Sequence, residues 1–292
     1  MSFEPIVYQR DEVLQSRLDS LLAETLYKDR IGLCVINCSR GLTTPLIAGH
    51  REMEFTYPAS LYKLYIAGAV LHQVNTAALR LSDIVLVSKV NAIDAKPEIP
   101  GDRRLLYSGD RVRVDHLLDM MITGSSNTAA NCLIDYISRN KINQFIARHG
   151  WGGSVVTRKF LPREMEPPFY RHVPRTVSCA RHFAEFLYLV EKGQIGRNST
   201  ELKEWLEEQL DRSKMKAGLP AGVIFSNKTG WYNDCDHPGS GYTGDAGIVE
   251  AGDLSYVISC LTEFPEPEGN HILAEIGAGV HQIMVDLHNN QK

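Results

Sequence analysis

The segment PASLYKLYIAGAVLHQV, residues 58–74, joins a serine and a lysine to the longest apolar run of the chain. Pro58 stands where helices often begin, and the residues after it predict a helix over Ser60–Val74. Residues three positions apart are neighbours on a helix surface, so the Lys63 amine lies within reach of the Ser60 hydroxyl. A serine hydroxyl is a weak nucleophile without an adjacent base, and a buried lysine that has lost its proton is such a base. The segment therefore predicts a nucleophile at the start of a helix.

The S-x-x-K spacing is weak evidence by itself, since ordinary composition produces about one copy in a chain of this length. A second copy, Ser138–Lys141, follows the helix predicted over Thr128–Ser138. We expect this second copy to be an exposed helix end.

Two further polar motifs lie far from the first. Ser125-Ser126-Asn127 stands at a loop-to-helix junction and, taken alone, is typical of a helix cap. Lys228-Thr229-Gly230 ends an apolar strand, where a glycine lets a ligand approach the backbone and a lysine beside a threonine suits a carboxylate. Taken alone, it also fits an ordinary strand end with an exposed lysine.

The hydrophobic pattern changes twice along the chain. Strands near both ends are joined by short turns, which favours an antiparallel sheet, whereas residues 55–210 are mainly helical. We expect an α/β (α+β) fold in which an antiparallel sheet, flanked by the N- and C-terminal helices, forms a discontinuous domain of residues 1–54 and 211–292 around an inserted all-helical domain. The predicted strands are Ile31–Asn37, Thr44–Ala48, Gly222–Lys228, Ala246–Glu250 and Leu254–Leu261, and the clear helices after the first are Val114–Ile122, Thr128–Ser138, Ile142–Arg148 and Cys179–Lys192.

The order S-x-x-K, S-x-N, K-T-G is the signature set of serine β-lactamases and penicillin-binding proteins. The sequence resembles a class A β-lactamase-related serine hydrolase from about Glu12 to His288, and the flanking stretches MITGSSNTAANCLI and Ala217–Gly222 are similar as well. The resemblance implies a β-lactamase/transpeptidase-like fold with the active site in the cleft between the two domains.

The resemblance also implies a role for each motif residue. Ser60 attacks an amide carbonyl and forms an acyl-enzyme, while Lys63 carries the proton. The remaining implied roles are proton transfer to the leaving nitrogen by Ser125, binding of the substrate side-chain amide by Asn127, binding of the substrate carboxylate by Lys228 and Thr229 beside Gly230, and an oxyanion hole from the backbone N–H groups of Ser60 and Trp231.

Deacylation separates a β-lactamase from a penicillin-binding protein, and class A enzymes use a loop glutamate for it. Glu166, in the stretch Glu166–Tyr170, resembles this glutamate and is the predicted deacylation base. The gap from Arg158 to Glu166 is about two residues longer than in the family, Tyr170 stands where an asparagine is usual, and Glu164 competes for the role. Two solvated loop glutamates remain the alternative, and the protein would then acylate without rapid hydrolysis.

Three further positions depart from the family pattern. Ser126 replaces an aspartate that supports the local turn. A long polar loop, Trp231–Gly244, follows the third motif where a tight turn is usual. Ala246 stands near the place of an arginine that helps to bind the substrate carboxylate, and Lys216 is a candidate replacement for that charge.

We expect a serine hydrolase that opens the β-lactam amide through an acyl-enzyme on Ser60. The alternatives are a DD-peptidase-like or esterase-like relative acting on another amide or ester, and a non-catalytic penicillin-binding homologue. The long loop after Trp231 and the lack of a visible secretory signal favour the relative, because a β-lactamase acts outside the cytoplasm. We therefore expect a cytoplasmic protein from the sequence as written, and a periplasmic or secreted one if a leader was removed.

The expected partner is a small-molecule amide, either a β-lactam or an acyl-peptide-like compound. The net charge of -4 gives no basic nucleic-acid footprint, and no apolar run is long enough to span a membrane. We expect no cofactor and no metal, since Asp234-Cys235-Asp236-His237 is too short for its side chains to converge on a closed site. The six cysteines predict buried, reduced thiols. The sequence does not predict an oligomeric state.

Overall fold

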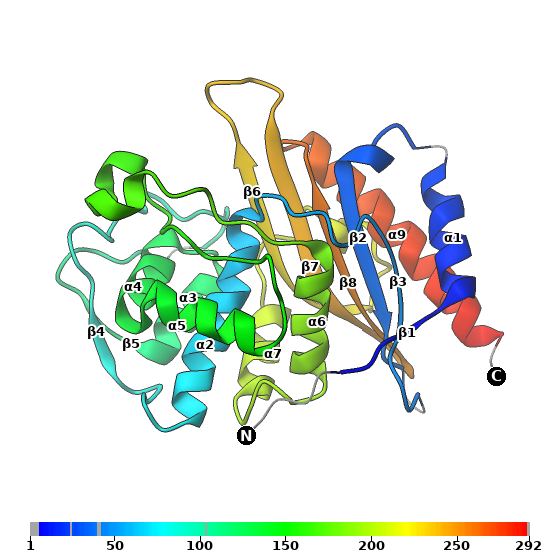
Figure 1. Ribbon diagram of the computed structural model, residues 1–292, viewed down its shortest axis with the longest axis horizontal. Helices are drawn as coiled ribbons and strands as arrows, with labels where there is room; N and C mark the ends of the chain where they lie inside the picture. The colour runs from blue at the N-terminus through cyan, green and yellow to red at the C-terminus, as the bar shows by residue number, and fades with distance from the viewer. Residues whose placement is uncertain (1–5, 24, 40–41, 103, 291–292) are drawn as a thin grey trace.

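A computed structural model describes residues 6–23, 25–39, 42–102 and 104–290, and it contains a six-stranded sheet with helices on both faces (Figure 1). Neighbouring strands run antiparallel, except that β1 pairs parallel with β3. In spatial order the strands are β1 (Gln9–Arg10), β3 (Leu46–His50), β2 (Ile31–Asn37), β8 (Leu254–Thr262), β7 (Gly241–Ala251) and β6 (Ile224–Asn233).

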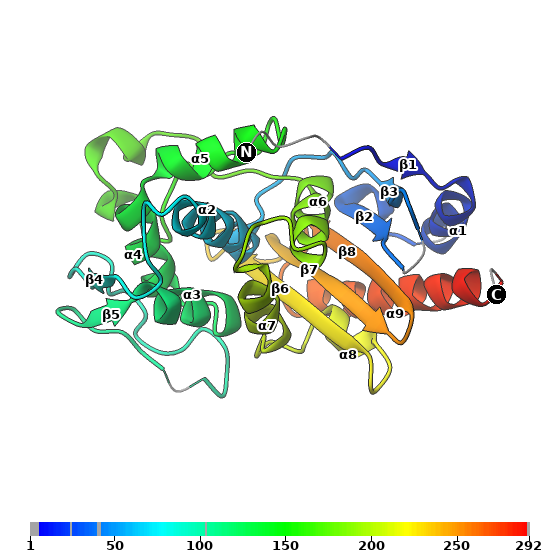
Figure 2. The ribbon, with the colours of Figure 1, turned by 90° about the horizontal axis from the view of Figure 1, so that it is seen from below.

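The sheet is buried on both faces because its side chains alternate between two cores. Leu33 and Val35 pack against α1 (Glu12–Ala23) and α9 (Glu268–Asn289), whereas Cys34 and Ile36 face the helical part of the chain. Helix α6 (Ala180–Glu191) lies across this second face and α9 along the first (Figure 2).

The helical part is built around α2 (Lys63–Asn75), which packs against the three helices named next. Every residue from Lys63 to Leu71 is buried, so α2 is the central helix of this core. These three helices are α3 (Val114–Thr123), α4 (Asn127–Ile137) and α5 (Arg139–Arg148). The other elements are α7 (Ser199–Glu207), α8 (Met215–Gly218), which packs against α9, the strand pair β4 (Ile84–Leu86) and β5 (Arg111–Arg113), and the 3₁₀ turns η1 (Lys28–Arg30), η2 (Ala59–Tyr62), η3 (Arg163–Met165) and η4 (Pro168–Arg171).

The fold class predicted from the sequence is confirmed, with local differences. Strands β1, β4 and β5 were not predicted, and the loop expected over Trp231–Gly244 is limited to residues 234–240. Strand β6 continues to Asn233 and β7 begins at Gly241, with Trp231 paired to Thr243. Aromatic and β-branched residues stabilise such cross-strand pairs, so the hairpin is longer than its polar composition suggested. The division into two domains stays a prediction.

The cysteines and the helix lengths can be compared with the sequence as well. All six cysteines, each in the described part of the chain, are free thiols; five are buried, and Cys235 at the hairpin tip is exposed. No helix within the described ranges combines the length and apolarity needed to cross a membrane.

Candidate active site

Ser60 and Lys63 lie where η2 leads into α2, beside strand β6 (Figure 1). Lys63 Nζ is 3.0 Å from Ser60 Oγ, and the lysine side chain is buried. The contact follows from the three-residue spacing on one helical turn. The second S-x-x-K copy behaves as expected, since exposed Ser138 accepts a hydrogen bond from the Lys141 N–H and caps α5.

The S-x-N segment meets the same lysine. Lys63 Nζ donates to the Ser125 carbonyl oxygen and lies 3.1 Å from Ser125 Oγ and 2.8 Å from Asn127 Oδ1. Ser126 is the cap of α4, because its Oγ accepts from the Ala129 N–H at 3.1 Å. The segment therefore caps α4 and also brings Ser125 and Asn127 into a polar cluster with Ser60 and Lys63.

Lys228 enters the cluster from the middle of β6. Its Nζ donates to Ser125 Oγ at 3.1 Å and to the Thr229 carbonyl oxygen at 2.8 Å. Three distant segments thus supply a continuous chain of contacts from Ser60 through Lys63 and Ser125 to Lys228. Thr229 Oγ1 is buried and has no hydrogen-bond partner among the described residues.

Gly230 lets strand β6 pass directly against Ser60. A Cβ at this position would lie 2.8 Å from the Ser60 backbone N and 2.9 Å from the Leu61 backbone N. The missing side chain therefore makes room for the protein's own backbone and brings residue 231 close to Ser60. Ala59 and Ser125 have φ angles of 46° and 57°, a region that costs non-glycine residues free energy and that is concentrated at functional sites.

Burial governs the protonation of both lysines. It lowers the pKa of Lys63 to about 7, although Glu98 and Asp94 act in the opposite direction. Burial, followed by the charge of Lys63, lowers the pKa of Lys228 well below its usual value. A neutral Lys63 amine has a lone pair available to accept the Ser60 proton.

A cavity of about 470 Å³ opens at Ser60. Ser60, Asn127 and Trp231 line it, together with Glu98, an exposed residue whose carboxylate accepts from Asn127 Nδ2 at 2.6 Å. Most of the remaining wall comes from the irregular segment 156–177, and Tyr57, Tyr62 and Tyr232 add to it. No group of three metal-ligating side chains is found among the residues that the structure describes.

The structure does not bring Glu166 into this cluster. Its fully buried carboxylate accepts from Arg139 Nη2 at 2.6 Å and from the Lys159 backbone N–H at 2.7 Å. The Arg139 guanidinium in turn lies over the Tyr170 ring at 3.8 Å. Glu166 ties its loop to α5, and neither it nor exposed Glu164 is among the described residues that line the cavity.

Phe160 lies beside the lysine instead. Its ring stacks on Tyr62 with centroids 4.4 Å apart, and Lys63 Nζ lies 4.3 Å from the ring centroid. Sequence reasoning did not single out Phe160, although the long gap from Arg158 to Glu166 indicated that this loop departs from the family pattern.

The matched family model is described as "Beta-lactamase enzyme family" and covers residues 13–284. The chain belongs to the β-lactamase enzyme family. Three solved structures have similar folds. PBP-A has a TM-score of 0.75 and 20% identity over 97% of this chain and 99% of its own. The TLA-3 extended-spectrum β-lactamase has a TM-score of 0.78 and 18% identity over 94% and 99%. The ancestral Gram-negative class A β-lactamase GNCA has a TM-score of 0.74 and 25% identity over 92% and 99%. The search of curated proteins gave no match.

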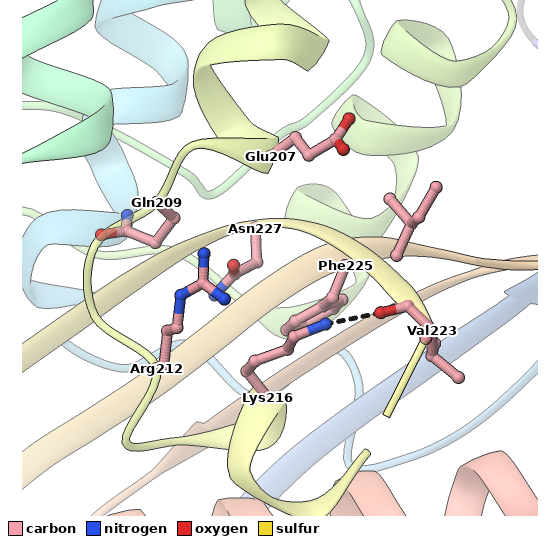
Figure 3. A pocket seen from close by; sticks show the side chains of 9 residues that line it. Glu207, Gln209, Arg212, Lys216, Val223, Phe225 and Asn227 are labelled. Atoms are coloured by element: carbon pink, nitrogen blue, oxygen red, sulfur yellow. Dashed lines mark hydrogen bonds between the residues drawn. The ribbon is translucent and has the colours of Figure 1, made fainter. Parts of the chain in front are cut away.

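The family and its structural neighbours identify a serine β-lactamase-like hydrolase. The structure does not place Lys216 with Ser60. Its Nζ donates to the Val223 carbonyl oxygen at 2.5 Å, in a separate cavity of about 260 Å³ that Arg212 and Asn227 also line (Figure 3).

Lys214 is a buried cation that sequence reasoning did not single out. It pairs with Asp211 at 2.6 Å and Glu266 at 2.8 Å, and has its Nζ 4.6 Å from the Trp231 ring centroid. Ala246 pairs with Lys228 in the sheet register, so β7 supplies no cation at that place. Nothing in the spacing of Lys214 distinguishes it from Lys216.

Proposed function

We propose that this protein forms an acyl-enzyme on Ser60 by attacking an amide or ester carbonyl, and that its β-lactam acyl-enzyme is long-lived. One observation carries the proposal: the buried Lys63 amine touches both Ser60 Oγ, at 3.0 Å, and Ser125 Oγ, at 3.1 Å. Its pKa of about 7 leaves roughly half of the molecules with a neutral lysine at pH 7.

In the first step, Lys63 Nζ takes the proton of Ser60 as the serine oxygen bonds to the carbonyl carbon. The carbonyl oxygen gains the electron pair, and we assign its stabilisation to the N–H groups of Ser60 and Trp231, each worth about 3 kcal/mol. When the bond to the leaving atom breaks, Ser125 gives that atom its proton and regains one from the Lys63 ammonium. The products are an ester on Ser60, a protonated leaving group and a neutral lysine.

The substrate is held at both ends in this scheme. Lys228 and the unpartnered Thr229 hydroxyl suit a substrate carboxylate. Asn127 Nδ2, which donates to Glu98 here, suits the carbonyl oxygen of a side-chain amide. Gly230 lets the backbone of β6 lie against the Ser60 backbone, which suits an oxyanion hole made by the N–H groups of Ser60 and Trp231.

Deacylation decides between a β-lactamase and a DD-peptidase-like or esterase-like enzyme. A general base contributes about 10²–10⁴-fold to such a step. Phe160 next to Lys63, and Glu166 committed to Arg139, favour the second class of enzyme, with slow hydrolysis of β-lactams. A neighbouring structure is described as a leucine-to-glutamate mutant of PBP-A in an acyl-enzyme complex with penicillin G.

The test uses benzylpenicillin and a chromogenic cephalosporin, followed by intact mass and by colour. We expect one covalent adduct per chain that persists after free drug is removed, and no adduct in Ser60→Ala. Ser138→Ala, which removes the serine of the second S-x-x-K copy, is the matched control and keeps the adduct.

Rapid turnover without a lingering adduct would instead identify an efficient β-lactamase. An adduct that survives in Ser60→Ala would refute the assignment of the nucleophile.

A further inference from the structure

Three arginines line the cavity at Ser60, and all three come from segment 156–177: Arg158, Arg163 and Arg175, here called the arginine wall. None has a carboxylate within 4.0 Å in the part of the chain that the structure describes. Lys159, in the same segment, differs in this respect, because it pairs with Asp135 at 2.9 Å. Unpaired guanidinium groups around one cavity favour an anionic ligand.

The contacts of the arginine wall leave donors available. Arg158 uses Nη2 to bind the Leu161 carbonyl oxygen at 3.2 Å, while its Nε is buried without a partner among the described residues. Arg163 donates from Nη1 to the Arg171 carbonyl oxygen at 2.9 Å. These hydrogen bonds orient the guanidinium groups of Arg158 and Arg163, and each group keeps further N–H donors for a ligand.

The Arg175 guanidinium lies 5.6 Å from the centroid of the Tyr57 ring, and Tyr57 lines the cavity as well. This contact places the third cation of the wall against an aromatic side chain, and its N–H groups have no hydrogen-bond partner among the described residues.

The position of the wall tells which end of a substrate it meets. Under the proposed function, Ser125, Lys228 and Thr229 handle the leaving group. The arginine wall belongs to a different segment, which reaches the nucleophile's helix through Phe160 on Tyr62. Since the acyl part and the leaving group extend in opposite directions from the attacked carbonyl, the wall faces the acyl part.

We propose that the acyl part of the substrate carries an anionic group, a carboxylate in the simplest case, which the arginine wall binds. The inference rests on acylation of Ser60. One opposing charge lines the cavity, Glu98, but it comes from another segment and is held by Asn127. Lys159 also lines the cavity but is paired with Asp135, so three unpaired arginines face one carboxylate. This balance predicts a preference for a negative acyl part over a neutral one, and for a neutral one over a positive one.

The experiment compares three penicillins that share a phenylacetyl-type side chain: benzylpenicillin, which is neutral there, carbenicillin, with an α-carboxylate, and ampicillin, with an α-ammonium. The second-order rate constant of acylation is measured by intact mass at low ionic strength. We expect carbenicillin to react about tenfold faster than benzylpenicillin, ampicillin to react more slowly than both, and added salt to reduce the difference.

Variants then test the assignment. The ratio of carbenicillin to benzylpenicillin should fall to about one in Arg163→Gln/Arg175→Gln, two exposed positions, and in Arg158→Gln. Arg212→Gln, which removes an exposed arginine that lines the other cavity, is the matched control and keeps the ratio. Thermal unfolding of each variant verifies that it is folded.

Equal rates for the three drugs, or fastest reaction with ampicillin, would overturn the inference while leaving acylation of Ser60 intact. A carbenicillin preference that survives in all wall variants would overturn the assignment to these arginines. If none of the three drugs labels Ser60, the proposed function fails, and the inference falls with it.

Discussion

The two sides of the cavity are built on different principles. On one side, Ser60, Lys63, Ser125 and Lys228 are anchored in a central helix, a helix cap and a strand, and their contacts are buried. On the other side, segment 156–177 is irregular, and its cavity-lining arginines are only partly buried or exposed. Under the proposed function, rigid elements hold the groups that transfer protons, whereas the loop determines which substrates bind and whether water is activated. Residue roles inferred from the family resemblance are therefore better supported for the first side than for the second.

The largest effect is expected from Lys63→Met on the rigid side. The variant removes the base and all of its hydrogen bonds, and we expect acylation by benzylpenicillin to slow by about 10³-fold. Stopped-flow or intact-mass kinetics measures the rate. Lys141→Met, at the exposed second copy, is the control; a comparable loss there would show that the effect is one of folding.

Glu166→Gln tests the loop side by stability. Removing one charge of a buried ion pair leaves the Arg139 guanidinium uncompensated, so we expect a loss of about 3 kcal/mol in the free energy of unfolding. Urea denaturation measures it, and exposed Glu164→Gln should change stability by less than about 0.5 kcal/mol. Unchanged stability, combined with a newly trapped adduct, would restore Glu166 as the deacylation base.

The pH dependence of acylation reports on the rigid side again. Because the pKa of Lys63 is lowered to about 7, the lysine is charged and inactive as a base below that pH. The acylation rate should fall about tenfold per unit below pH 7 and level off above it. Burial also raises the pKa of Asp245 to about 7, so Asp245→Asn must retain the same limb if Lys63 is responsible.

The smallest effect sharpens the contrast between loop and scaffold. Phe160→Glu places a carboxylate where the ring now lies beside Lys63, and we expect hydrolysis of the penicillin adduct to accelerate about tenfold, part of the full value of a general base. Loss of adduct mass with time measures it. Phe160→Leu serves as the control, since it opens space without adding a base, and equal acceleration there would assign the effect to water access.

The sequence was sufficient to predict the site residues that lie on regular helices and strands. One helical turn fixes Ser60 against Lys63, and the alternation of apolar residues locates β6 and hence Lys228. It was insufficient in segment 156–177, where irregular backbone with four prolines has no periodicity to set a register. Glu166 matched the family pattern by residue type but pairs with Arg139, while Phe160 lies beside Lys63. The same holds for Lys214 and Lys216, two residues apart, whose different surroundings depend on how the chain enters α8.

The tight packing at Gly230 has a consequence for how this protein can change. The atoms that a side chain at position 230 would meet belong to the backbone of Ser60 and Leu61, so no substitution can make them smaller. Any residue larger than glycine would therefore force strand β6 away from Ser60. Substitutions in segment 156–177 can change the entrance of the cavity, whereas position 230, beside Ser60, accommodates only glycine. New specificities in this scaffold will therefore arise at the rim, around a centre whose dimensions stay constant.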